Sequence, residues 1–531
     1  MCLSARVGAG LVSARNKEFK MAKAIMIQGT GSGVGKSVIV AALCRIFLQD
    51  GYRVAPFKAQ NMALNSFVTT EQGEIGRAQA VQAQACRIEP SVDMNPVLLK
   101  PTSHVGSQVI VLGKAIGNMS AMRYARYKPK LLSVVRKSFD RLMCEYDLVI
   151  IEGAGSPAEI NLKSHDIVNM KMAEYADCPV VLVGDIDKGG VFAWLWGTLD
   201  LLPKGEKKRI KALLINKFRG DRRLLDSGIQ YLEKKTGKKV LGVIPYFTDI
   251  KIPEEDSASL EMKTRDVRHT ALADARQIEI AVIKLPHISN FTDFDALSNE
   301  KDVRLSYVDN KEQLKGTDII IIPGTKNTIA DLLWLKRSGL AKQILSAICY
   351  PPPLAKQALS ATLIGICGGF QMLGKEVLDP WGIESSRKKR SNGLGVLNMV
   401  TALEKEKTVS QVKAHEITSG IEVSGYEIHH GRTKVFDTLA PMFEIVERKG
   451  RRAKVKDGAL SAEGTIWGTY IHGIFDNDSF RRAFLERIAV KNNKSSSFQR
   501  GTTFNQEEEF NKLAQLVRGN IDRRLLYSMI R

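Results

Sequence analysis

Residues 24–37 read AIMIQGTGSGVGKS, a short apolar run followed by a glycine-rich loop that ends in lysine and serine. Because a helix-length apolar segment follows to residue 48, the stretch predicts a strand, a phosphate-binding loop and a helix. Backbone N–H groups of such a loop and the positive end of the helix bind phosphate oxygens, while the serine hydroxyl binds Mg²⁺. The loop is a variant, since a threonine stands where a glycine usually lies six residues before the lysine. The residues expected to contact a nucleotide are Thr30, Gly31, Gly33, Gly35, Lys36 and Ser37.

Three polar side chains are expected at the same edge of the sheet as this loop. Glu152 ends a predicted strand, Asp185 follows another, and Asn216 ends a third. Open parallel sheets bind ligands outside the carboxyl ends of their strands, so these residues should gather near the loop. We expect Glu152 and Asp185, together with Ser37, to be metal ligands and Asn216 to hydrogen-bond adenine. Taken singly, each residue is equally consistent with a helix cap or a turn.

Short apolar runs alternate with helix-length segments along the chain, which predicts an α/β fold with mostly parallel sheets. The length of 531 residues suggests three or four domains of about 150 residues, but it fits two larger, doubly wound domains joined by a charged connection equally well. The expected strands are 24–28, 53–57, 108–112, 148–151, 180–184, 212–216 and 240–244, then 278–284, 303–307, 318–322 and 362–366, with β-rich segments near 393–400, 421–429 and 464–470. The expected divisions are a disordered tail over 1–22, a first domain over 23–250, a linker over 251–277, a second domain over 278–490, and a linker with one closing helix over 491–531.

The composition is that of a globular chain, with 44% hydrophobic and 25% charged residues, which excludes a collagen-like or disordered protein. Lys and Arg outnumber Asp and Glu by 78 to 57. The net charge of +21 favours anionic partners such as nucleotides, polycarboxylates, nucleic acid or lipid headgroups, without choosing among them. No apolar stretch of the sequence approaches the roughly 20 residues that span a bilayer. The seven cysteines stand singly, without CxxC pairs, which favours a reducing cytoplasm.

A second motif, TLIGICGGFQ at residues 362–371, centres on Cys367. The glycines beside the cysteine permit a sharp turn from strand to helix that exposes the thiol, and the helix N-terminus favours the thiolate. Gly324, at the end of the neighbouring predicted strand, is expected to lie at an oxyanion hole. A nucleophilic cysteine also requires a base. The candidate bases are His472, His429 and His430.

The phosphate loop and the cysteine turn on one chain together resemble the cobyrinic acid amidase family of glutamine-dependent amide synthases, over about residues 23–487. The most specific stretches are QGTGSGVGKS at 28–37, QNMALNS at 60–66, GDIDKGG at 184–190, GYEIH at 425–429 and YIHG at 470–473. The front half is similar to dethiobiotin synthetase and the back half to triad-type glutamine amidotransferases. The resemblance therefore implies a P-loop NTPase-like synthetase domain followed by a class I glutamine amidotransferase-like domain.

The resemblance also implies roles for residues of the second half. Cys367 matches the glutaminase nucleophile and His472 its base, while Gln371, together with Gly324, is expected to contact the substrate glutamine. Triad glutaminases carry a glutamate two residues after the histidine, where this chain has Ile474. A Cys–His dyad is therefore implied, and the sequence does not identify the group that orients His472.

The same resemblance implies ATP and Mg²⁺ as co-substrate and metal, with glutamine and a corrinoid polycarboxylate as the other substrates. The b, d, e and g carboxylates of adenosylcobyrinic acid a,c-diamide would be amidated in turn, with no permanently bound cofactor and no nucleic acid or membrane partner. The loop after the second strand is expected to face this substrate. Its expected contacts are Lys58, Gln60, Asn61 and Asn65.

Three alternatives stay open. Cobyrinic acid a,c-diamide synthases apply the same chemistry to other carboxylates, although the segment at 61–66 argues against that activity. A partition-type ATPase, which acts as a nucleotide-dependent switch bound to DNA or membranes, would also need the phosphate loop. Such ATPases carry a further lysine where this chain has Gly31, and they lack a cysteine turn. A glutaminase half that has lost its function would leave free ammonia as the nitrogen donor.

Overall fold

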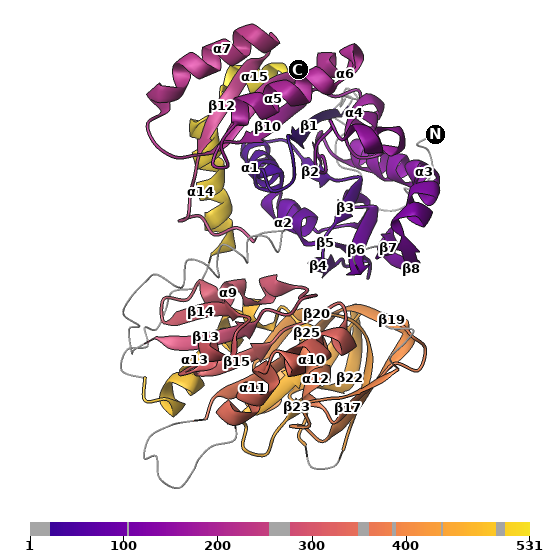
Figure 1. Ribbon diagram of the computed structural model, residues 1–531, viewed down its shortest axis with the longest axis vertical. Helices are drawn as coiled ribbons and strands as arrows, with labels where there is room; N and C mark the ends of the chain where they lie inside the picture. Colours follow the sequence, from indigo (N-terminus) through magenta and orange to yellow (C-terminus); the bar gives the residue numbers. More distant parts are fainter. Residues whose placement is uncertain are drawn as a thin grey trace, which may run out of the picture.

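The computed structural model describes residues 22–103, 106–253, 277–348, 360–384, 389–436, 439–494 and 505–531. Residues 1–21 of the expected tail and 254–276 of the expected linker lie outside the described residues. The chain forms two domains, one above the other in Figure 1, and each contains a largely parallel sheet. The expected fold class, two doubly wound α/β domains, is therefore confirmed.

The first domain has a six-stranded parallel sheet in the order β12-β11-β10-β1-β9-β2. Strands β9 and β2 lie on one side of β1 (Lys23–Gly29), and β10 to β12 lie on the other side. The phosphate loop follows β1 and thus occupies the point at which strand order switches, where open sheets bind ligands. The other strands are β2 (Val54–Phe57), β9 (Leu148–Glu152), β10 (Val180–Asp185), β11 (Ile210–Phe218) and β12 (Lys239–Pro245).

Two separate apolar cores cover the two faces of this sheet. Ile25 and Ile27 of β1 belong to the core that includes α1 (Lys36–Gln49), whereas Met26 belongs to the core that includes α3 (Ala121–Glu145). Because successive strand residues point to opposite faces, helices enclose the sheet from both sides. The other helices are α2 (Arg77–Ala85), α4 (Met170–Tyr175), α5 (Val191–Leu201), α6 (Lys204–Arg209) and α7 (Asp226–Thr236).

The predicted strand 108–112 does not belong to the parallel sheet. It corresponds to β7 (Gly106–Val111), in a small sheet of order β3-β6-β7-β8 that is antiparallel from β6 to β8. Two residues separate β6 from β7, whereas parallel neighbours need a crossover of about a dozen. This sheet faces the second domain (Figure 1). Its other strands are β3 (Gln60–Met62), β6 (Val97–Ser103) and β8 (Lys114–Ser120), and a hairpin of β4 (Ser66–Val68) and β5 (Glu74–Gly76) lies beside it.

The second domain has a six-stranded sheet in the order β14-β13-β15-β16-β24-β23, parallel except at the edge strand β23. Cys367 directly follows β16 (Thr362–Ile366), whose neighbours are β15 (Ile319–Ile322) and β24 (Ile466–Thr469). The other strands are β13 (Ile278–Ile283), β14 (Val303–Val308) and β23 (Ala459–Leu460), and the helices are α9 (Asp295–Ser298), α10 (Thr328–Arg337), α11 (Leu340–Ile348), α12 (Gly368–Leu373) and α13 (Asp478–Lys491).

A mixed second sheet of order β18-β17-β19-β20-β25 completes this domain, with β21 paired to β19 and β22 paired to β21. Tyr426 of β20 (Glu422–Val435) stands opposite His472 of β25 (Ile471–His472). The predicted β-rich segment 393–400 is wrong in its first six residues. They turn against the backbone near residue 374, and a Cβ on Gly393 would lie 1.9 Å from the carbonyl oxygen there. The other strands are β17 (Glu376–Leu378), β18 (Arg390–Asn392), β19 (Met399–Glu416), β21 (Phe443–Arg448) and β22 (Arg451–Asp457).

The C-terminal segment returns to the first domain and forms two helices, α14 (Gln506–Gly519) and α15 (Arg523–Ser528), where one was expected. Phe510, Leu513 and Val517 of α14 are buried in the same core as α1. The last segment of the chain therefore completes one face of the first sheet.

The described helices do not include one that could cross a membrane. The longest of them, α3, has 25 residues, but basic side chains recur along it. The helix α3 is therefore a long amphipathic surface helix that packs one face on the sheet.

Replacing Phe510 with alanine tests the place of α14 in the core. Loss of a fully buried phenylalanine should lower the free energy of unfolding by about 3–5 kcal/mol, measured by urea denaturation followed by circular dichroism. The exposed Gln515 on the same helix provides the control, and Gln515→Ala should change the value by less than about 0.5 kcal/mol. Equal effects of the two substitutions would contradict the packing described for α14.

Candidate active site

The phosphate loop adopts a cradle that depends on glycine. Gly33 has a φ of 69° and Gly35 a φ of 93°, in the left-handed region that glycine adopts without strain. The Lys36 ammonium donates to the carbonyl oxygens of Gly31, at 2.8 Å, and Gly155, at 3.3 Å. A cation and the N–H groups of a strand-to-helix loop therefore face the same space, as phosphate binding requires.

Two of the polar side chains expected at the strand ends lie against this loop. The Asn216 amide donates to the Val34 carbonyl at 2.9 Å, so a hydrogen bond from the end of β11 holds the loop in place. Asp185 forms an ion pair with Lys217 at 2.8 Å, and the same ammonium donates to the Gly33 carbonyl at 2.7 Å. The structure therefore brings both residues to the nucleotide side of the sheet, as the strand-end argument predicts.

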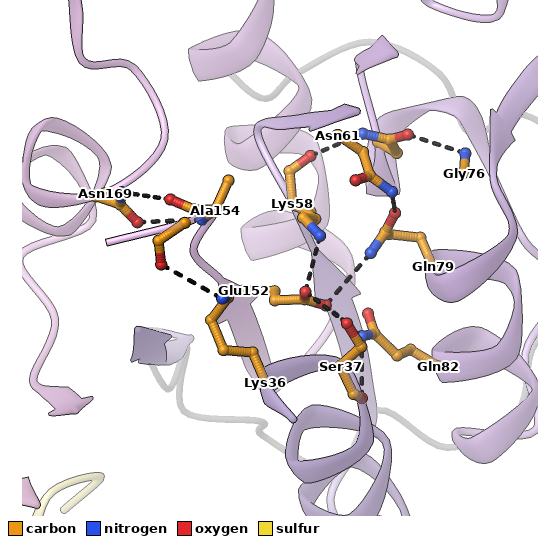
Figure 2. A network of polar contacts seen from close by, with 12 residues as sticks. Lys36, Ser37, Lys58, Asn61, Gly76, Gln79, Gln82, Glu152, Ala154 and Asn169 are labelled. Atoms are coloured by element: carbon orange, nitrogen blue, oxygen red, sulfur yellow. Dashed lines mark hydrogen bonds and ion pairs between the residues drawn. The ribbon is translucent and has the colours of Figure 1, made fainter. Parts of the chain in front are cut away.

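Glu152 is fully buried and forms the centre of a polar network (Figure 2). Its Oε1 accepts from the Ser37 hydroxyl and from the Lys58 ammonium, each at 2.8 Å. Its Oε2 accepts from the Gln82 amide at 2.5 Å and from the Gln79 amide at 3.4 Å. A buried carboxylate is tolerated when a cation and hydrogen-bond donors surround it, as they do here. The network joins the serine of the phosphate loop to the strand end.

The residues expected to bind the substrate divide between two places. Asn61 is buried beside the Glu152 network, where its amide donates to Gln79 at 2.9 Å. Gln60 accepts from the Tyr124 hydroxyl at 2.6 Å. Asn65 instead faces the second domain. The expected substrate loop thus lies partly at the nucleotide site and partly at the domain interface.

Cys367 occupies a strained turn between β16 and α12. Its φ of 51° and ψ of −106° are unusual for a residue with a side chain. The backbone N–H donates to the Thr469 carbonyl at 2.8 Å, and Sγ lies 3.6 Å from the Ile428 carbonyl oxygen. A Cβ on Gly369 would lie 1.9 Å from the Ile322 carbonyl oxygen, so glycine is required there. The backbone forms the strand-to-helix turn predicted from the sequence, but Cys367 is only 6% exposed and lines a cavity rather than the open surface.

Asp293 orients His472, and the sequence did not reveal it. The Nδ1 atom of His472 lies 2.6 Å from an Asp293 carboxylate oxygen, and both side chains are buried. Burial acts to lower the pKa of His472, but the Asp293 carboxylate and Cys367 raise it to about 10. Ile474, at the position of the usual glutamate, packs in the apolar core. Asp293, carried by the 3-10 helix η4 (Phe291–Phe294), is therefore a candidate third member of the predicted Cys–His pair.

Three histidines line the same cavity as Cys367, and their Nδ1 partners differ. His429 Nδ1 lies 2.8 Å from the Gly431 carbonyl oxygen, and His430 Nδ1 lies 3.0 Å from the Glu404 carbonyl oxygen. Burial and nearby lysines lower the pKa of His430 to about 4. The carboxylate partner of His472 favours it as the base, since it fixes the ring and stabilises the protonated form.

The cavity beside Cys367 has a volume of about 890 Å³ and is lined by both domains. Gln371 lies in its wall and accepts from the Thr328 hydroxyl at 3.1 Å. A Cβ on Gly324 would lie 3.0 Å from Cε1 of His472, so the backbone approaches the base closely there. The first domain contributes Glu74, Lys100 and Gln108 to the same cavity.

Comparison with known proteins identifies both halves. Residues 25–260 match the CobQ/CobB/MinD/ParA nucleotide binding domain, and residues 279–480 match the CobB/CobQ-like glutamine amidotransferase domain. A cobyric acid synthase of Syntrophobacter fumaroxidans is 49% identical over 94% of this chain and 97% of its own length. Cobyric acid synthases of Thermoanaerobacter sp. (strain X514) and Dehalococcoides mccartyi (strain CBDB1) are each 49% identical, over 96% of this chain and 99% of their own lengths.

This chain belongs to the cobyric acid synthase family. The family resemblance inferred from the phosphate loop and the cysteine turn is confirmed. The protein is accordingly an enzyme, and its two domains correspond to the nucleotide-binding and glutamine amidotransferase halves of the cobyric acid synthase family.

Replacing Asp293 with asparagine should move the pH dependence of glutamine hydrolysis. The protonated form of His472 predominates below its pKa of about 10, so the rate of glutamate release should fall as pH rises through that value. Without the carboxylate, burial dominates and lowers the pKa, so the fall should begin at a lower pH. At the same time, the maximal rate should decrease roughly tenfold or more.

The matched control is Asp295→Asn, which also removes one negative charge, two residues away from Asp293. Its pH–rate profile, measured by glutamate release, should coincide with that of the unmodified protein. Identical profiles for all three proteins would show that Asp293 does not act on His472.

Proposed function

We propose that this protein amidates the b, d, e and g carboxylates of adenosylcobyrinic acid a,c-diamide to adenosylcobyric acid, using ATP and glutamine. The observation that carries the proposal is the cavity in which Cys367 and His472 face residues of the nucleotide-binding domain. The names of relatives that match nearly the whole chain support the substrate assignment.

The nucleotide half activates the carboxylate. Carboxylates do not react with ammonia at neutral pH, so the γ-phosphoryl group of ATP must first be transferred to form an acyl phosphate. The loop N–H groups and Lys36 stabilise the charge on the phosphates as the bond to the leaving oxygen breaks. Lys58 and Asn61, which lie beside the phosphate loop network, are assigned to the corrinoid carboxylate, with Gln60 on the same strand. Ammonia then attacks the acyl carbon, and phosphate leaves.

Ser37 and Glu152 fit a Mg²⁺ site, because their oxygens lie 2.8 Å apart at the end of β9 and oxygen is the ligand that Mg²⁺ prefers. Asp185 is the further candidate ligand. Among the described residues there is no group of three or more His, Cys, Asp or Glu side chains that could hold a metal. Mg²⁺ in nucleotide sites is usually held by one or two carboxylates together with waters and phosphates. When bound, Mg²⁺ supplies positive charge for the phosphate oxygens.

The second domain releases ammonia from glutamine. The Cys367 thiolate attacks the amide carbon, and His472 donates its proton to the departing nitrogen, which leaves ammonia and a γ-glutamyl thioester. Water then attacks the thioester, His472 accepts a proton from that water, and glutamate leaves as the Cys367 thiolate beside protonated His472 is restored. The backbone at Gly324 and the side chain of Gln371 are assigned to the bound glutamine. Asp293 holds the imidazole through both steps.

The shared cavity suits the transfer of ammonia between the domains. Burial acts to raise the pKa of Glu74, but Lys100 and Lys407 hold it well below its usual range. Within the described part of the chain, the lining of the cavity carries six lysines against four glutamates, and burial and the other lysines lower the pKa of Lys326 to about 7. A cationic lining repels ammonium and leaves neutral ammonia, the reactive species, unaffected.

Replacing Cys367 with alanine should abolish amidation with glutamine and preserve amidation with ammonium, because only the first requires the thiol. Mass spectrometry of the corrinoid should show four successive exchanges of OH for NH₂ with the unmodified protein. Lys36→Ala should abolish synthesis from either donor, since it removes phosphate stabilisation.

The exposed Cys144 provides the control, and Cys144→Ala should match the unmodified protein with both donors. A Cys367→Ala protein that still uses glutamine would contradict the assigned nucleophile. An unmodified protein that amidates a substrate at the a and c positions would instead favour the a,c-diamide synthase alternative.

A further inference from the structure

Two asparagines exchange hydrogen bonds across the domain interface, close to the glutaminase base. The backbone N–H of Ser66 in the first domain donates to the Asn290 side-chain oxygen at 3.0 Å. In return, the backbone N–H of Phe291 in the second domain donates to the Asn65 side-chain oxygen at 3.1 Å. All four residues are buried, so neither pair can exchange its partner for water.

On the second-domain side, this contact fixes the turn that orients His472. Asn290 has a φ of 53° and a ψ of 39°, a left-handed conformation that asparagine tolerates at some cost. Its side-chain nitrogen lies 3.4 Å from Nδ1 of His472. Phe291 begins η4, the helix that carries Asp293. A loop of the first domain therefore holds the second-domain turn that carries Asn290 and Asp293, whose side chains lie beside Nδ1 of His472.

Tyr426 forms a second connection between the same loop and the base. Its hydroxyl donates to the Ser66 carbonyl oxygen at 3.3 Å, and its ring stacks on His472 with centroids 5.3 Å apart and planes inclined by 15°. Phe67 of the first domain packs against the same ring, with its centroid 5.7 Å from that of Tyr426. The base is thus confined by a ring that the first domain holds in place.

The loop is also anchored to its own domain. The Asn65 carbonyl oxygen accepts from the backbone N–H of Arg77, at 3.2 Å, where α2 begins. The same helix carries Gln79 and Gln82, which donate to Glu152. Asn65 therefore projects from a rigid support that adjoins the phosphate loop.

We propose that Asn65 of the nucleotide-binding domain is a positioning residue for the glutaminase site, acting on His472 through the turn that contains Asn290 and Asp293. The inference rests on the proposed function, because it assigns Asn65 to the release of ammonia. It replaces the expectation that Asn65 contacts the corrinoid, since the side-chain oxygen of Asn65 is occupied by the second domain.

Substituting Asn65 with alanine separates the two roles. The kcat for glutamate release should fall about tenfold or more, because small misplacements of catalytic groups are costly, while the KM for glutamine stays within about twofold. The alkaline limb of the pH–rate profile should move to lower pH as Asp293 loses its alignment with His472. Amidation driven by ammonium should stay within about twofold, since the nucleotide site keeps its residues.

Asn95 provides the matched control. It is a buried asparagine of the same domain, and its side chain bonds to the backbone of Gly76, Lys58 and Val97, all within that domain. Asn95→Ala should therefore leave glutamate release without ATP unchanged. Tyr426→Phe, which removes a single hydroxyl from the contact, should lower kcat in the same direction as Asn65→Ala and keeps the test valid if that variant does not fold.

Unchanged glutamate release in a folded Asn65→Ala protein, or in Tyr426→Phe if the alanine variant does not fold, would overturn the proposal. An equal loss of ammonium-driven and glutamine-driven amidation would also overturn it and assign Asn65 to the corrinoid. Failure of the proposed function is distinguishable, because it would appear in the unmodified protein as an absence of corrinoid amidation.

Discussion

The buried exchange of hydrogen bonds between Asn65 and Phe291, and between Ser66 and Asn290, is the constraint on which the active arrangement depends. Each bond joins a backbone N–H of one domain to a side chain of the other. Leaving a buried polar group without a hydrogen-bond partner costs about 1–3 kcal/mol of stability. A shift of the two domains that breaks these bonds is therefore unfavourable unless water replaces the lost partners. The contact therefore fixes where the glutaminase turn stands relative to the nucleotide site.

Other polar contacts repeat this arrangement along the interface. The Lys407 ammonium, from the second domain, pairs with Glu74, and Lys100 of the first domain pairs with the same carboxylate. Gln411 donates to the Val68 carbonyl at 2.8 Å. Buried charges and amides specify geometry more strictly than apolar contacts, because only one alignment satisfies them. The cavity at Cys367 thus has walls whose relative positions are set by directional bonds.

Local chemistry made two parts of the site predictable from the sequence. The phosphate loop and the turn at Cys367 each require particular residues within about ten positions, because backbone close approach and positive φ exclude most side chains. The position of Glu152 and Asp185 at one edge of the sheet followed from a topological rule, since parallel strands end at one edge. Asn216 followed from the same rule.

Partners that are distant in sequence were not predictable in this way. Asp293 reaches His472 across 179 residues and lies in a short 3-10 helix with no motif of its own, so the only available signal was an acidic residue soon after a strand. The strand at 108–112 was assigned to the wrong sheet, because an apolar run in the sequence does not specify which strands it pairs with. The return of α14 to the first domain places Glu507 at 2.8 Å from the buried Arg45 guanidinium, 462 residues away in sequence.

The central claim is that one molecule carries nitrogen from Cys367 to its own phosphate-activated substrate. The most direct test supplies glutamine labelled with nitrogen-15 in the amide, together with an excess of unlabelled ammonium, and measures the isotope content of the amidated corrinoid by mass spectrometry. The account predicts that the product retains nearly all of the label despite the ammonium in solution. A label content equal to the isotope ratio of the bulk ammonia would contradict it, because the two sites would then communicate only through solvent.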